Sequence, residues 1–245
     1  MAILAPSNLD YIVTICALSR LGFGIFLLSN RLAPEAFKHL LAQSGCNQIV
    51  FGPELAKQFA SIQQILPVTC FQMPEKSAYD LPSPSGPPLP KLQISPAVAK
   101  ARIAIIIHSS GSTGFPKPIY QTHSACLANY SSGGGTPYRG FMTLPLYHNH
   151  GLSTLFRSIW AGKKISIYSA SLPLSEPNIV AGLLSEKPES FHGVPYGLKL
   201  LAENERGISE LRKCKQVVFG GSSCPDDLGD RLVEHGVNLI AHYGA

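Results

Sequence analysis

Short apolar runs alternate with amphipathic segments along almost the whole chain of 245 residues. The apolar runs are rich in β-branched side chains, as in RIAIIIH at 102–108, which is typical of strands buried on both faces of a sheet. The segments between them carry apolar residues at helical spacing. Repeated strand–helix units of this kind predict an α/β fold with mostly parallel, doubly wound sheets and flanking helices.

The individual elements can be predicted from this alternation and from the signals that begin and end helices. Strands are expected at 2–4, 24–28, 48–51, 102–108, 141–144, 164–168, 189–192, 216–219 and 238–242. Helices are expected at 7–20, 34–44, 121–130, 152–160, 176–186, 196–204 and 225–235. In the first helix we expect Ser7 to be the cap, with Asp10 placed for a capping box.

A stretch rich in proline and serine interrupts the alternation between residues 74 and 96. Prolines lack the backbone N–H that sheets and helices need, so we expect a surface linker at 81–97. The sequence therefore predicts two α/β subdomains, at 1–80 and 98–245, which this linker joins.

Composition and charge argue against several classes of protein. The chain is 45% hydrophobic and 14% charged, and its 20 basic residues against 15 acidic ones form no basic run, so we expect no nucleic-acid partner. Asp10 and Arg20 divide the apolar N-terminus into pieces too short for a membrane span, so no membrane is expected. The six cysteines show neither a CxxC pair nor zinc-like spacing, which favours reduced thiols in a cytoplasmic protein.

The most unusual segment is HSSGSTGFPK, which occupies 108–117. Its glycines let successive backbone N–H groups converge on a ligand, and its hydroxyls and lysine add donors and charge. We therefore predict that this segment binds a di- or triphosphate. The alternative is a polar surface loop without a ligand. It is not a Walker loop, because Pro116 precedes Lys117 where that motif needs glycine. The candidate phosphate-binding residues are Ser109, Ser110, Gly111, Ser112, Thr113, Gly114 and Lys117.

Two further polar segments follow predicted strands. FGGSSCP follows the strand at 216–219, and HYG follows the strand at 238–242. Because the carboxyl ends of parallel strands share one edge of a sheet, we expect both segments to meet the phosphate loop there.

Together these segments resemble the motifs of the adenylate-forming superfamily. SSGSTGFPK resembles its phosphate loop, and LPLYHNHGL, VVFGGSS and AHYG resemble later motifs in the order that the family has them. The superfamily includes acyl- and aryl-CoA synthetases, luciferases, and the adenylation domains of nonribosomal peptide synthetases and carboxylate reductases. KPIYQTH and the segment at 219–245 are most similar to fungal carboxylate reductases that resemble nonribosomal peptide synthetases.

The resemblance implies the reaction of an acid–thiol ligase. A small carboxylic acid would attack the α-phosphate of ATP, pyrophosphate would leave, and an acyl adenylate would form. Mg²⁺ would bridge phosphate oxygens during this step. The acyl group would then pass to a thiol, either of CoA or of the phosphopantetheine on a carrier-protein domain.

The resemblance also implies roles for individual residues. His148 would be the catalytic residue that positions or gates the carboxylate, and Tyr243 would stack on adenine. The backbone of Gly221, Ser222 and Ser223 would contact the purine. The acyl pocket would include Asn149, His150, Leu152, Gly220 and His242.

Two of these assignments have alternatives. His148 and His150 form a His-x-His pair, which could hold a metal ion, but nothing nearby in the sequence supplies a convincing third ligand, so no metal site is expected. Tyr243 could instead pack into the core at the end of its strand.

The chain also departs from the family pattern. It stops at Ala245, where the family continues with a Thr-Glu pair and a small C-terminal domain that carries a catalytic lysine, and Met1 aligns inside the first subdomain. Pro118 stands where the family often has glycine. We therefore expect a chain truncated at both ends. The alternative hypothesis is a catalytically inactive fragment that at most binds a nucleotide or a partner chain.

Overall fold

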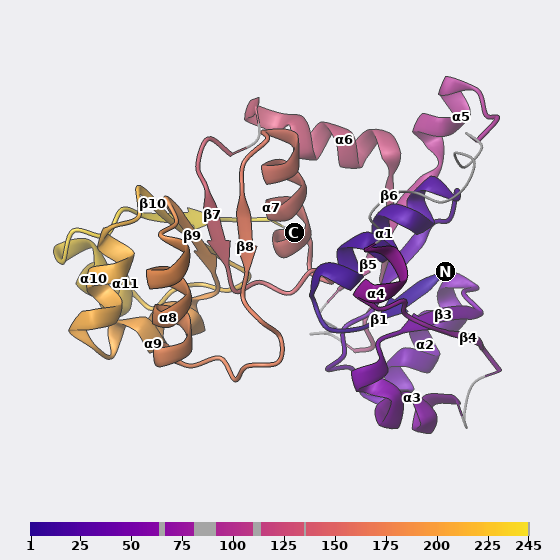
Figure 1. Cartoon of the computed structure of the whole chain (residues 1–245), viewed down its shortest axis with the longest axis horizontal. Helices are drawn as coiled ribbons and strands as arrows, with labels where there is room; N and C mark the ends of the chain where they lie inside the picture. Colours follow the sequence, from indigo (N-terminus) through magenta and orange to yellow (C-terminus); the bar gives the residue numbers. More distant parts are fainter. Residues whose placement is uncertain (64–66, 81–91, 110–113, 135, 245) are drawn as a thin grey trace. The chain divides into compact units, whose positions relative to one another are not determined.

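The structure is a computed structural model that describes residues 1–63, 67–80, 92–109, 114–134 and 136–244. The chain divides into two compact units, Met1–Ala128 and Asn129–Ala245. Each unit has its own β-sheet with helices packed on it (Figure 1). The expected α/β fold with mostly parallel sheets is confirmed.

The first unit is built on a six-stranded sheet in the order β4-β3-β1-β2-β5-β6. Neighbouring strands are parallel except β5 and β6, which run antiparallel. β5 pairs with β2 so that Ile105 lies opposite Ile25. The strands are β1 (Ala2–Leu4), β2 (Ile25–Leu27), β3 (Gln48–Phe51), β4 (Thr69–Gln72), β5 (Ile103–His108) and β6 (Pro118–Thr122).

Helices lie between most strands of the first unit, as expected, although three of them, Ala56–Gln63, Lys76–Tyr79 and Pro96–Ala101, were not predicted. A buried core of side chains from the sheet and from α2 includes Phe26, Phe37, Leu40 and Ile49. Gly45 ends α2 in the left-handed conformation, at φ 63°, which glycine adopts without steric cost. The helices are α1 (Leu9–Arg20), α2 (Pro34–Ser44), the 3₁₀ turn η1 (Pro53–Leu55), α3 (Ala56–Gln63), α4 (Lys76–Tyr79), α5 (Pro96–Ala101) and α6 (His123–Ser131), which crosses into the second unit.

The N-terminal cap of α1 differs from the prediction by one residue. Asn8, not Ser7, is the cap, and its side-chain oxygen accepts a hydrogen bond of 2.9 Å from the backbone N–H of Tyr11. Both residue types favour the cap position, so the sequence does not separate them. Asp10 therefore lies one position too early for a capping box, and its carboxylate instead accepts a hydrogen bond from the Tyr79 hydroxyl.

The second unit is built on a five-stranded parallel sheet in the order β11-β10-β9-β7-β8. Its strands are β7 (Gly140–Met142), β8 (Ile165–Ile167), β9 (Ser190–Gly193), β10 (Gln216–Gly220) and β11 (Leu239–His242). After the 3₁₀ turn η2 (Ser132–Gly134), its helices are α7 (Asn149–Trp160), α8 (Glu176–Glu186), α9 (Pro195–Ala202), α10 (Glu205–Arg212) and α11 (Asp226–Glu234). Within the described residues, none of the helices combines the length and the apolar character needed to cross a membrane.

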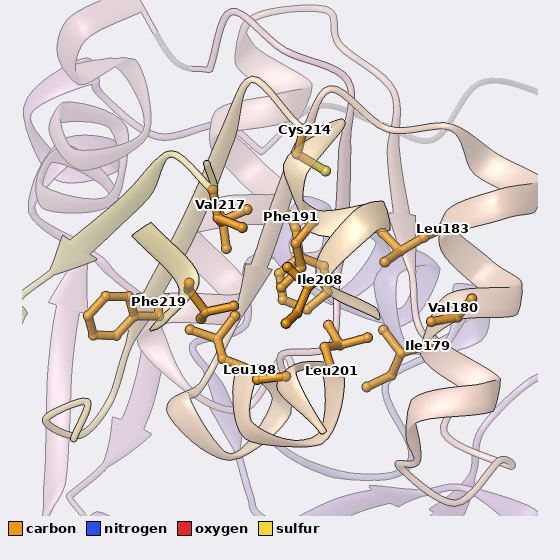
Figure 2. Close-up of a cluster of buried hydrophobic side chains, with 14 of the residues drawn as sticks. Ile179, Val180, Leu183, Phe191, Leu198, Leu201, Ile208, Cys214, Val217 and Phe219 are labelled. Carbon is orange, nitrogen blue, oxygen red and sulfur yellow. The ribbon is translucent and has the colours of Figure 1, made fainter. Parts of the chain in front are cut away.

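The two faces of this second sheet have different characters. Side chains of Phe191, Val217 and Phe219 point into a hydrophobic core formed with α8, α9, α10 and α11 (Figure 2). The helix α7 lies on the other side of the sheet (Figure 1). Because successive side chains of a strand alternate between the faces, the strand residues between these core positions face the side of α7.

The boundary between the two units differs from the predicted linker at 81–97. The β-branched strand that follows the proline-rich stretch is β5, which completes the sheet of the first unit instead of beginning the second. Consequently the three candidate segments do not follow strands of one sheet. The phosphate loop follows β5 of the first sheet, whereas the other two segments follow β10 and β11 of the second.

Candidate functional site

The phosphate-loop segment connects β5 to β6 and is closed at its base. The backbone N–H of Ser109 donates to the carbonyl of Lys117 at 3.0 Å, and the Lys117 N–H donates to Ser109 Oγ at 2.9 Å. These bonds continue the antiparallel pairing of His108 with Pro118. The side chain of Lys117 is exposed and forms no ion pair with another described residue. Four of the predicted phosphate ligands, Ser110, Gly111, Ser112 and Thr113, lie outside the described residues.

The second half of this segment rests on α2. The ring of Phe115 stacks on the ring of His39, with 4.9 Å between their centroids and 24° between their planes. Gly114 has a φ of 143° and nothing within 4 Å of the position that a Cβ would take. A side chain at Gly114 would therefore be strained by the backbone conformation, not by crowding.

His108 ties the base of the segment to the end of β2. This buried residue accepts a hydrogen bond at Nε2 from the backbone N–H of Ser29, at 3.2 Å, and its Nδ1 lies 3.0 Å from the Ser109 carbonyl oxygen. Because Nε2 accepts, Nδ1 carries the proton and donates. Burial lowers the pKa of His108, which favours this neutral form. His108 was not among the predicted site residues; in the sequence it is recognisable only as a polar residue that ends an otherwise apolar strand.

The segment that contains His148 forms the beginning of α7 in the second unit. His148 is the N-cap residue, and its carbonyl accepts a hydrogen bond of 3.0 Å from the N–H of Leu152. The exposed ring of His148 lies edge-on to the ring of Tyr147, with 4.7 Å between centroids. Asn149 is the first residue of the helix, and Leu152 is fully buried.

Three of the predicted acyl-pocket residues lie together in the second unit. The ring centroids of His150 and His242 are 5.0 Å apart, and the two rings are arranged edge-on. A Cβ on Gly220 would lie 2.5 Å from the carbonyl oxygen of His242 and 3.2 Å from Nδ1 of His150. Only glycine fits at position 220, because a side chain would collide with backbone there.

Burial and a neighbouring imidazole lower the pKa of His150 to about 4. Burial is the larger cause, and His242 adds a smaller repulsion between the two positive charges. His150 is therefore neutral near neutral pH. Its Nε2 is buried and has no hydrogen-bond partner among the described residues.

The remaining predicted residues lie in exposed turns. Gly221 adopts the left-handed conformation, at φ 89°, and together with Ser222 and Ser223 it leads from β10 toward α11. The ring of Tyr243 is 92% exposed. This exposure contradicts the alternative that Tyr243 packs into the core, and it leaves the ring face accessible to a ligand.

The structure adds His192 to the residues that the sequence predicted for the second unit. His192 lies on β9 and is buried, and burial together with the charges of His150 and His242 lowers its pKa to about 4. Among the described residues no group of three or more His, Cys, Asp or Glu side chains is arranged to hold a metal ion. A lone histidine in an apolar strand gives no sign of its partners in the sequence.

A family model described as AMP-binding enzyme matches residues 1–245. The chain belongs to the AMP-binding enzyme family. This membership agrees with the order of the motifs along the chain, from the phosphate loop to the segment that ends in Tyr243. It also confirms the resemblance from which the residue roles were predicted.

Relatives within the AMP-binding family include an adenylate-forming reductase of Aspergillus terreus, which is 29% identical over 252 residues. That match covers 97% of this chain and 24% of the reductase. A feruloyl-CoA synthase of Amycolatopsis is 24% identical over 253 residues, a match that covers 100% of this chain and 48% of the synthase. The chain thus spans about a quarter to a half of the curated relatives that it matches.

Solved structures of the same fold include adenylate-forming ligases. The anthranilate CoA ligase AuaEII in complex with anthranoyl-AMP superposes with a TM-score of 0.83 at 18% identity, over 100% of this chain and 48% of that chain. The ATP-bound MatB of Rhodopseudomonas palustris superposes with a TM-score of 0.76 at 18% identity, over 99% of this chain and 49% of that chain. At these identities the likeness establishes the fold.

Proposed function

We propose that this chain is the ATP-binding part of an adenylate-forming ligase, which activates a carboxylic acid as an acyl adenylate and releases pyrophosphate. The observation that carries the proposal is the closed base at Ser109 and Lys117 in a chain that the AMP-binding family matches along its whole length. This base presents an exposed lysine beside a segment rich in glycine and hydroxyls. Such a segment suits the phosphates of a nucleotide.

The reaction brings two anions together, so the protein contributes mainly charge neutralisation and alignment. A carboxylate oxygen attacks the α-phosphorus of ATP, and the bond between that phosphorus and the pyrophosphate oxygen breaks. In the proposed arrangement Lys117 and the loop at 109–114 hold the β- and γ-phosphates, and His148 positions the carboxylate. The exposed ring of Tyr243 stacks on adenine, while the backbone at 221–223 lies along the purine.

Mg²⁺ belongs to the proposal as part of the nucleotide complex. The described residues contain no group of His, Cys, Asp and Glu that could hold a metal by itself. This fits Mg²⁺, which proteins usually bind through one or two carboxylates together with substrate phosphates and water. The acyl group would afterwards pass to a CoA thiol or to the phosphopantetheine of a carrier-protein domain. The name of the feruloyl-CoA synthase supports the first acceptor, and a relative named as a non-canonical non-ribosomal peptide synthetase supports the second.

A nuclear magnetic resonance titration of the ¹⁵N-labelled chain tests this proposal. MgATP should shift the backbone amide signals of Ser109, Gly114 and Lys117, and also those of 221–223 and Tyr243, in a saturable manner. Tripolyphosphate should shift the first group alone, and adenosine the second group alone, because each ligand carries one half of the nucleotide. No saturable shift with MgATP, or shifts confined to other surfaces, would contradict the proposal.

A further inference from the structure

A cluster of histidines lies on the face of the second sheet that is turned away from the hydrophobic core. On β9, Phe191 points into that core, so His192, the next residue, points to the other face. The helix α7, which carries His150 at its beginning, lies on this same face (Figure 1). Three elements therefore contribute one imidazole each: β9 gives His192, α7 gives His150 and β11 gives His242.

The orientation of the His192 ring follows from its neighbours. Its Nε2 lies 3.1 Å from the Ser190 hydroxyl, and its Cδ2 lies 3.7 Å from the position that a Cβ on Gly140 of β7 would take. This edge of the ring therefore faces β7. Nδ1 is on the other side of the ring, toward β10, the second neighbour of β9. It is buried and has no hydrogen-bond partner in the described part of the chain.

The end of β10 lies close to His150 and His242, whose rings contact each other. A Cβ on Gly220, the last residue of β10, would collide with the backbone carbonyl oxygen of His242 and lie 3.2 Å from Nδ1 of His150, so the lack of a side chain lets the end of β10 lie directly against the His150 ring. Like Nδ1 of His192, Nε2 of His150 is buried without a partner among the described residues. Two unpaired ring nitrogens thus belong to one cluster around the end of β10.

The chemistry of these two unpaired ring nitrogens favours a ligand group that can form hydrogen bonds without carrying a charge. A buried polar atom without a hydrogen bond has lost the bond it would form with water, so a ligand that pairs it gains affinity. Both rings are neutral near neutral pH because burial lowers the pKa of each to about 4. A neutral imidazole offers one donor and one acceptor and no charge, which suits a hydroxyl group better than a second carboxylate.

We propose that the acyl pocket of this chain selects carboxylic acids that carry a hydroxyl group, and that the unpaired nitrogens of His192 and His150 bind that hydroxyl. This inference rests on the proposed function, because it assigns the substrate class of the same site. A hydroxyl donates to one ring nitrogen and accepts from the other. An acid without the hydroxyl leaves both nitrogens unpaired, and a site of this kind discriminates strongly against such a ligand.

Matched pairs of acids test the inference on the wild-type chain. Each isomer of hydroxybenzoate is compared with benzoate, and 4-hydroxycinnamate with cinnamate, by equilibrium binding in the presence of AMP. At least one hydroxylated acid should bind about tenfold more tightly than its partner, and it should shift the ring ¹⁵N signals of His192 and His150. Equal affinities within every pair, unchanged ring signals, or a preference for terephthalate would overturn the inference.

Variants of His192 make the test specific to this ring. In His192→Phe the preference for the hydroxylated acid should fall to less than about twofold, whereas His192→Gln, which keeps a donor and an acceptor, should retain most of it. The exposed His235 provides the control, since His235→Gln should leave the preference unchanged. Retention of the full preference in His192→Phe would overturn the inference. If that variant does not fold, the ring signals of the wild type decide.

Binding of MgATP, measured on the same samples, distinguishes failure of the proposed function from failure of the inference about hydroxylated acids. MgATP binding without any preference for hydroxylated acids overturns the inference and leaves the proposed function standing. Absence of MgATP binding contradicts the proposed function, whatever the acids do.

Discussion

Replacing Lys117 with alanine is expected to weaken the binding of MgATP by about tenfold or more. The exposed ammonium group lies at the closed base of the phosphate-loop segment and forms no ion pair with another described residue, so its charge is available to a ligand. A hydrogen bond to a charged group contributes about 1.5 to 3 kcal/mol, which corresponds to about 10- to 100-fold in affinity. Isothermal titration of the wild-type and variant chains measures this difference.

Two further variants control the Lys117 experiment. Lys100→Ala removes another exposed lysine of the first unit and should leave the affinity for MgATP within about twofold. Lys117→Arg keeps the charge and should retain much of the binding. If Lys117→Ala bound MgATP as tightly as the wild type, the segment at 109–117 would not be the phosphate-binding site.

Acidification is expected to destabilise the chain through its buried histidines. The pKa of His192 is about 4 in the folded chain, against an ordinary value of 6.5. Between these values the unfolded chain binds a proton that the folded chain does not, so the free energy of unfolding falls as the pH is lowered. The contribution of His192 is fully present above about pH 6.5 and is lost progressively toward pH 4, where the loss reaches about 3 kcal/mol. His150 adds a loss in the same direction.

Urea unfolding followed by circular dichroism, from about pH 7 to about pH 4.5, measures this loss. His192→Gln cannot take up the proton, so its free energy of unfolding should fall less steeply with decreasing pH than that of the wild type. The exposed-site variant His235→Gln should keep the wild-type slope. Identical slopes for the wild type and His192→Gln would show that His192 is not held neutral by burial.

Local patterns were enough to predict most of the fold. The bounds of β3 at Gln48–Phe51 and of α8 at Glu176–Glu186 match the predicted ones. Each element has a clear hydrophobic periodicity and clear start and stop residues at its ends. β6 was not predicted, since it begins at Pro118 and proline argues against a strand. As an edge strand, β6 tolerates a residue without a backbone N–H. The short helix α10 was missed because only a few of its residues, such as Ile208 and Leu211, are apolar and buried.

The division of the chain could not be predicted from local composition. A proline-rich stretch predicts an exposed connection, but it does not say which sheet the next strand will join. β5 pairs with β2 across more than seventy residues of sequence, and this long-range pairing places β5 in the first unit.

The candidate site was predictable only where a motif carried it. The sequence motifs indicated the phosphate loop, His148 and the group of His150, Gly220 and His242, and the structure brings the last three together. His108 and His192 were missed because an isolated histidine within an apolar strand looks the same in sequence whether it is structural or functional. Only their partners distinguish them: Ser29 and Ser109 for His108, and an unpaired nitrogen beside other imidazoles for His192.

The affinity of the chain for stable analogues of an acyl adenylate tests the central proposal most directly. Acyl sulfamoyladenosines with benzoyl and hydroxybenzoyl groups combine the nucleotide and the acid in one molecule, and AMP contains the nucleotide alone. If the chain forms the site of an adenylate-forming ligase, at least one of these analogues should bind about tenfold or more tightly than AMP. Affinities no greater than that for AMP would contradict the proposal that nucleotide and carboxylic acid bind side by side in this protein.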